Sequence, residues 1–90
     1  MSTDDKCCTI VPYFQVHPGK MDAFKSLCTQ FVSQTNGEPE CLYYGFTFDG
    51  DQTHCREGYA NADALLAHLE NVGALLQEGP RQAGLLARRP

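Results

Sequence analysis

The most constraining feature of the sequence is a pair of central segments, each patterned with a period of two and joined by a short turn. In the first segment Tyr43, Gly45 and Thr47 alternate with an apolar set, which is Leu42, Tyr44, Phe46 and Phe48. A period of two is typical of a β-strand, because successive side chains point to opposite faces. Residues 49–52 read Asp-Gly-Asp-Gln, a turn sequence, and residues 53–59 follow as the return strand. The pattern predicts an antiparallel hairpin that pairs Phe46 with Cys55, Tyr44 with Glu57, and Leu42 with Tyr59.

Two segments with helical spacing flank this hairpin. Before it, apolar residues three or four positions apart run from Met21 to Val32, and Asn36-Gly37 closes the pattern. After it, Asn61 is a suitable N-cap for a second apolar stripe, which consists of Leu65, Leu69, Val72 and Leu76. We expect this second helix to end near Gly79-Pro80, with Leu69 in the centre of its buried face.

The two ends of the chain have different patterns. Residues 8–16 are rich in β-branched and aromatic side chains, which predicts a strand covered on both faces. Pro12 interrupts this strand and donates no ladder hydrogen bond, so we expect a sheet edge or a bulge there. Residues 81–90 show no alternation and contain Gly84, which predicts a frayed tail.

Together these elements predict an α+β fold in the order strand, helix, strand, strand, helix. This is the ferredoxin-like β-α-β-β-α plan, an antiparallel sheet with two helices on one face, in which the fourth strand is missing. Its absence would leave the first strand at a sheet edge. We expect a single domain over residues 1–90, with its core in residues 7–78 and a tail in residues 79–90. Because so short a chain is marginally stable alone, a homodimer is expected.

Charge and cysteine content exclude several classes of protein. The formal net charge is −4 and all eleven acidic residues precede residue 79, so nucleic acid is not an expected partner. The apolar runs are far shorter than the roughly 20 residues that cross a membrane, and the polar first residues lack a secretory pattern. We therefore expect a cytoplasmic protein with no membrane contact. Five cysteines without a CxxC pair predict reduced thiols and no metal site.

Residues 56–68 combine three features: a strand with a Glu-x-aromatic sequence, a polar helix cap and a histidine inside the helix. Glu57, Tyr59, Asn61 and His68 supply them. This combination resembles the antibiotic biosynthesis monooxygenase family of dimeric α/β barrels, and the turn at Pro18-Gly19 before a Met-Asp-Ala-Phe helix also fits. The resemblance spans roughly residues 7–78. Members of that family include cofactor-independent oxygenases of polycyclic phenols, quinone-linked proteins, isomerases and haem-degrading enzymes.

His68 and Glu57 are the candidate catalytic residues. His68 lies at the border of the second apolar stripe, partly buried at most, where an imidazole can deprotonate a phenol or bind a substrate oxygen. The hairpin register places Glu57 on the aromatic face, where it can act as general acid or base, or orient His68. The alternatives are a boundary histidine bonded to backbone or water, and a Glu57 paired with Arg56, Lys20 or Lys25.

The candidate substrate-binding residues are aromatic and could line a cleft for a flat, apolar molecule: Tyr13, Tyr44, Phe46 and Tyr59. Aromatic side chains on strands can equally be core or dimer interface. No glycine-rich phosphate loop is present, so no nucleotide cofactor is expected. The resemblance brings haem into consideration, with His68 as its iron ligand, but the sequence has no further sign of a haem pocket, so we expect no cofactor.

These observations predict a small cofactor-independent monooxygenase-like or isomerase-like protein. Its substrate would be a small aromatic or quinone-type molecule, held in a pocket between the helices and the sheet. The alternative is a non-catalytic dimeric binding or stress-related module, in which the same aromatic residues form the subunit interface.

Overall fold

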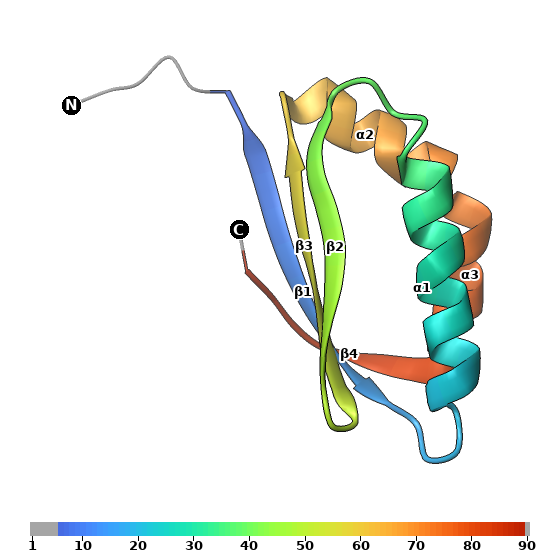
Figure 1. Cartoon of the computed structure of the whole chain (residues 1–90). Coiled ribbons are helices and arrows are strands. Elements are labelled where there is room, and N and C mark those ends of the chain that lie inside the picture. Colours follow the sequence, from blue (N-terminus) through green and yellow to red (C-terminus); the bar gives the residue numbers. More distant parts are fainter. Residues whose placement is uncertain (1–5, 90) are drawn as a thin grey trace.

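The computed structural model describes residues 6–89, and over these residues four strands and three helices follow one another (Figure 1). The elements are β1 Cys8–Val16, α1 Met21–Thr35, β2 Cys41–Asp49, β3 Gln52–Tyr59, α2 Ala62–Asn71, α3 Gly73–Gln82 and β4 Ala83–Arg89. The expected first strand, first helix and central hairpin are therefore confirmed. So is Asn61 as N-cap, because its side chain accepts a hydrogen bond of 2.8 Å from the Ala64 amide.

The strands form one antiparallel sheet in the order β2-β3-β1-β4, and the described helices all lie against one of its faces (Figure 1). This is the ferredoxin-like arrangement. Two buried clusters join the layers. One contains Val16, Phe24, Cys28 and Ala83, and the other contains Leu27, Phe31 and Val72.

The predicted frayed tail and missing fourth strand are wrong, because residues 83–89 form β4 and pair with β1 from Val16–Ala83 to Val11–Arg89. The strand was not visible in the sequence because its seven residues show no period of two. The edge of β1 orders this strand, because β1 offers backbone hydrogen-bonding groups at its residues other than Pro12. β1 is therefore an inner strand, not the edge strand that we expected.

Pro12 is accommodated within this inner strand by interruptions on both sides. Pairing of β1 with β3 skips the positions between Ile10 and Tyr13, and pairing with β4 shifts register between Tyr13 and Phe14. The bulge that Pro12 predicted is thus present, although the edge position is not.

The hairpin register is confirmed at its centre and wrong at its open end. Phe46 lies opposite Cys55 and Tyr44 opposite Glu57, as expected. However, the register shifts between Cys41 and Tyr43, so that Cys41 takes the position opposite Tyr59. Leu42 consequently leaves the ladder and is 55% exposed.

The second predicted helix is in fact two helices. The backbone leaves the helical path at Val72 (φ −101°, ψ 12°), and α3 continues through Pro80 to Gln82. Val72 is fully buried, whereas Leu69 and Leu76 are 43% and 46% exposed. The expectation that Leu69 is a central core residue is therefore wrong, because it lines an open pocket instead.

Candidate functional site

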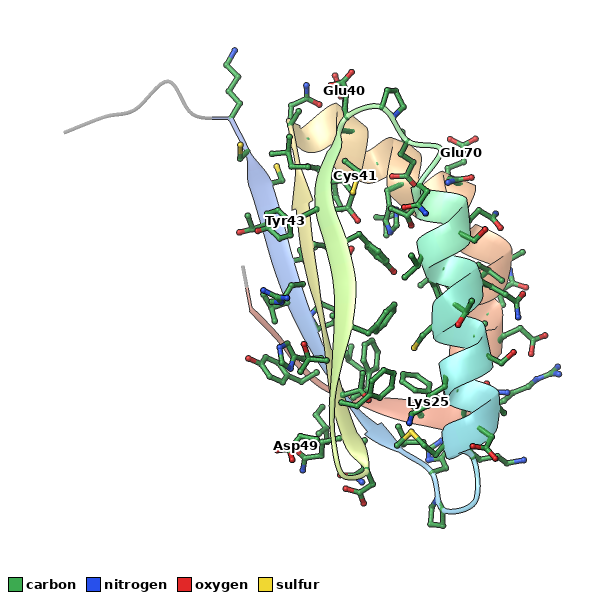
Figure 2. All side chains as sticks on the ribbon, in the orientation of Figure 1. Lys25, Glu40, Cys41, Tyr43, Asp49 and Glu70 are labelled. Atoms are coloured by element: carbon green, nitrogen blue, oxygen red, sulfur yellow. The ribbon has the colours of Figure 1, made fainter. Side chains whose placement is uncertain are left out.

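A pocket of about 340 Å³ lies between the helices and the helix-facing side of the sheet. Side chains from every strand and helix contribute to its wall, most of them apolar, and Figure 2 shows side chains filling the space between sheet and helices. Glu57 and His68 are the two lining residues that carry a carboxylate or an imidazole. A larger open hollow of about 660 Å³ runs between α1 and β2, beside Lys25 and Phe48, and contains neither of them. The smaller pocket is the candidate site, since it combines an apolar wall with two acid–base groups.

His68 lies two turns into α2 and is only 2% exposed, so the expectation of at most partial burial is wrong. Its Nδ1 lies 2.8 Å and 3.1 Å from the two carboxylate oxygens of Glu38. Its Nε2 lies 3.6 Å from Oε1 of Glu57. The rings of Tyr44 and Tyr59 pack on the imidazole, with centroids 5.2 Å and 5.0 Å away. A buried histidine between two carboxylates differs from the boundary histidine that was the alternative.

Glu57 lies two residues before the end of β3 and lines the pocket, with 8% of the residue exposed. The Tyr59 hydroxyl donates a hydrogen bond of 2.6 Å to its Oε1, the same oxygen that faces His68. Of the basic residues in the described part of the chain, His68 is the one within 4 Å of this carboxylate. The alternative pairing with Arg56, Lys20 or Lys25 is therefore not present.

The four predicted substrate-binding residues take three different places. Tyr44 and Phe46 line the pocket, with their rings edge to face at 5.6 Å. Tyr59 is fully buried behind Glu57, so that it holds the carboxylate and does not form a wall. Tyr13 lies on the opposite face of the sheet, where its ring stacks on His54 at 5.3 Å. The structure does not bring Tyr13 to the pocket.

Burial keeps the hydroxyl and thiol groups of this region protonated. Burial is the main cause that raises the pKa of Tyr44, and the neighbouring Cys55 and Glu57 raise it further. Burial also raises the pKa of Tyr59, and the hydrogen bond from Tyr59 to Glu57 adds to this effect. Burial likewise raises the pKa of Cys55, and that of Cys28 to about 12. These groups can donate hydrogen bonds at neutral pH but are not nucleophiles there.

Glu38 is the site residue that sequence reasoning missed. It lies in the connection between α1 and β2, thirty residues before His68, and belongs to no periodic pattern. Its position beside Pro39 marks a loop but gives no sign of a partner on a distant helix. Only the packing of α2 against the end of α1 brings Glu38 to His68.

The residues of the site do not suit an iron porphyrin. Nε2 of His68 faces Oε1 of Glu57 at 3.6 Å, so a haem iron at this nitrogen would have to displace the Glu57 carboxylate. Within residues 6–89 no group of three or more histidine, cysteine, aspartate or glutamate side chains is arranged to hold a metal ion. The three described helices are also too short or too polar to cross a membrane.

The family model "Antibiotic biosynthesis monooxygenase" matches residues 8–74. Among solved structures, MupZ from Pseudomonas fluorescens is 40% identical with a TM-score of 0.90, over 98% of this chain and 69% of MupZ. SnoaB from Streptomyces nogalater, a cofactor-independent oxygenase, shares the fold at 14% identity and a TM-score of 0.80, over 94% of this chain and 92% of SnoaB. A conserved protein from Methanosarcina mazei shares the fold at 17% identity and a TM-score of 0.82, over 94% of this chain and 92% of that protein. Comparison with curated proteins found no match. The family match over residues 8–74 shows that the chain belongs to the antibiotic biosynthesis monooxygenase family.

Proposed function

We propose that the protein is a cofactor-independent, monooxygenase-like enzyme that acts on a small, uncharged aromatic molecule. The observation that carries the proposal is the Glu57–His68 pair, with Nε2 and Oε1 3.6 Å apart, in the wall of an apolar pocket. Family membership and the fold shared with SnoaB, itself a cofactor-independent oxygenase, support the same chemistry.

The charge of the pocket supports an uncharged ligand. Its described lining contains no lysine or arginine, and its acidic group is Glu57. A phosphorylated or carboxylated ligand would have to leave water without a fixed cation to pair with, which is costly. Aromatic walls, formed by Phe14, Phe24, Phe31, Tyr44 and Phe46, favour a flat molecule instead.

The chemistry requires the protein to move one proton and to exclude water. His68 Nε2, or the second oxygen of Glu57, accepts the proton of a phenolic hydroxyl, and the electron-rich phenolate then reacts with dioxygen. A phenol and dioxygen give a quinone and water, so the substrate itself supplies the electrons that reduce the second oxygen atom. His68 or Glu57 returns the accepted proton to this second oxygen atom, which leaves as water. An isomerisation would use the same first step without oxygen.

Binding and oxygen uptake with a neutral polycyclic phenol, 2-naphthol, would test the proposal, with 2-naphthoate as its charged analogue. We expect 2-naphthol to bind and 2-naphthoate to bind at least tenfold more weakly, on the order of 1.4 kcal/mol. His68→Gln, which keeps most of the side-chain volume, and Glu57→Gln should each lower turnover by about 100-fold or more. The surface variant Glu70→Gln, on the same helix as His68, is the control and should behave like the parent.

Three results would change the assignment. Product formation without oxygen uptake would replace the oxygenase with an isomerase. Equal affinity for the two naphthalene ligands would remove the argument from pocket charge. If both active-site variants bind and react like the parent, the non-catalytic binding module takes the place of the enzyme.

A further inference from the structure

His68 has a carboxylate at each ring nitrogen, and the two carboxylates occupy different environments. Glu57 lines the pocket, whereas Glu38 lies behind the imidazole and does not. Glu38 also makes the closer approach, at 2.8 Å and 3.1 Å from Nδ1 against 3.6 Å between Glu57 and Nε2. Glu38 is therefore outside the pocket lining, and its effect on a ligand in the pocket passes through His68.

The geometry points to Glu38 as the positioning residue of the site: it fixes the His68 tautomer that carries its proton on Nδ1, so that Nε2 is the nitrogen offered to Glu57 and the pocket. An ionised carboxylate only accepts hydrogen bonds, so Nδ1, within hydrogen-bond distance of Glu38, must be the donor, whereas Nε2 at 3.6 Å from Glu57 is beyond that distance. In a neutral imidazole the other nitrogen then has the lone pair. The catalytic meaning of this arrangement rests on the proposed function, but the tautomer itself does not.

Glu38 is itself held in place by side chains at the ends of two helices. The side-chain amide of Asn71 donates one hydrogen bond of 2.8 Å to Oε2 of Glu38 and another of 3.1 Å to the backbone carbonyl of Gln34. In return the Gln34 side chain donates a bond of 2.8 Å to the Asn71 carbonyl. Both hydrogens of the Asn71 amide are thus used, and the carboxylate has a fixed orientation.

The backbone around Glu38 is also restrained. Its amide donates a hydrogen bond of 2.9 Å to the Thr35 carbonyl at the end of α1, and Pro39 restricts its backbone to extended conformations. Its side chain is only 13% exposed. A loop carboxylate held this firmly can select one imidazole tautomer, whereas a mobile one could not.

This arrangement would assist proton abstraction in two ways. With Nδ1 already protonated, Nε2 is available to accept a substrate proton without a prior tautomer change. Once it has accepted that proton, the imidazolium has one carboxylate at each nitrogen, Glu38 and Glu57, to stabilise the new charge. The same logic applies to a histidine held by an aspartate in serine hydrolases.

Nitrogen NMR of the full chain, labelled with 15N-histidine, would test the tautomer directly and requires no substrate. His68→Gln assigns its signal among the three histidines. In spectra recorded up to about pH 9, where a neutral imidazole can be observed, we expect the parent to show Nδ1 protonated. Glu38→Ala should move the population toward the Nε2-protonated form, whereas Glu38→Gln, whose side-chain oxygen can still accept from Nδ1, should retain the parent tautomer.

Glu40→Ala is the matched control, since Glu40 lies in the same connection, near the top of Figure 2, and bonds to Asn61 at 3.1 Å instead of to His68. It should leave the His68 signal unchanged. A parent with Nε2 protonated, a ring doubly protonated up to about pH 9, or a Glu38→Ala spectrum like that of the parent would overturn the inference. So would an equal shift in Glu40→Ala.

A kinetic measurement separates this inference from the proposed function. With 2-naphthol we expect Glu38→Ala to lower kcat by about 10- to 100-fold with KM changed less than about threefold, and Glu38→Gln to recover most of the loss. If Glu38→Ala changes the His68 tautomer but the parent turns over no phenol, the role of Glu38 stands and the proposed function is contradicted. A loss of turnover without a tautomer change would contradict the role of Glu38 alone.

Discussion

At the scale of single residues, burial determines protonation in the core and should make the folded protein sensitive to alkali. Burial raises the pKa of Cys28 from 9.0 to about 12, and it also raises the pKa of Cys55, Tyr44 and Tyr59. A group whose pKa is raised by folding keeps its proton longer in the folded state. Its contribution to stability is complete below the unfolded pKa and is lost as the pH rises through the folded pKa.

The free energy of unfolding should therefore be level up to about pH 9 and decrease toward pH 12, with thiols contributing first and tyrosines from about pH 10. Urea unfolding at a series of pH values measures this. Cys28→Ala removes one titrating group, so its alkaline decrease should be shallower than that of Cys7→Ala, which alters an exposed cysteine. A stability that increases between pH 9 and 12 would contradict the argument.

At the scale of elements, β4 completes the sheet beside β1 and closes one side of the core. Ala83 begins this strand and is 5% exposed, in a cluster with Val16, Phe24 and Cys28. Backbone pairing with β1 and burial of this small side chain hold the strand in the sheet. Without β4, one side of the cluster that contains Val16, Phe24 and Cys28 would face water.

Ala83→Asp should lower the free energy of unfolding by about 2 kcal/mol or more, because it places a carboxylate without a partner among apolar side chains. The same substitution at Ala67, an exposed position on α2, should cost less than about 1 kcal/mol. Chemical unfolding of both variants measures the difference. Equal effects would mean that residue 83 lies in a frayed tail in solution.

At the scale of the whole molecule, one face of the sheet has no described element against it (Figure 1). Tyr43 points to this side, away from the helices (Figure 2), and is 49% exposed. Val11 and Tyr13 alternate with the pocket-lining residues of β1 and so face the same way. An apolar, aromatic surface of this kind favours association.

We therefore expect a homodimer built sheet against sheet, with a mass by sedimentation of about 20 kDa for a chain of 10.0 kDa. Tyr43→Asp should shift the species toward the monomer by placing a charge in the interface. Leu66→Asp changes an apolar side chain that is 63% exposed on α2, on the other side of the molecule, and should leave the dimer intact. A strictly monomeric parent at tens of micromolar would contradict the prediction.

The sequence alone determined the features that depend on neighbouring residues. Helical spacing identified α1, a run of β-branched and aromatic residues identified β1, and a period of two identified the central hairpin, whose register placed Glu57 opposite Tyr44. The combination of Glu57, Tyr59, Asn61 and His68 was also sufficient to suggest the family that the comparisons then showed.

Only the tertiary structure decided the features that depend on contacts between distant segments. β4 forms because β1 offers a sheet edge, Leu69 lines a pocket because the helix breaks at Val72, and Glu38 meets His68 across thirty residues of chain. None of these contacts leaves a local period in the sequence, because a residue in a loop or a short strand needs no repeating neighbours to make a single specific contact. Local patterns therefore revealed the elements, whereas their packing brought together the residues of the candidate site.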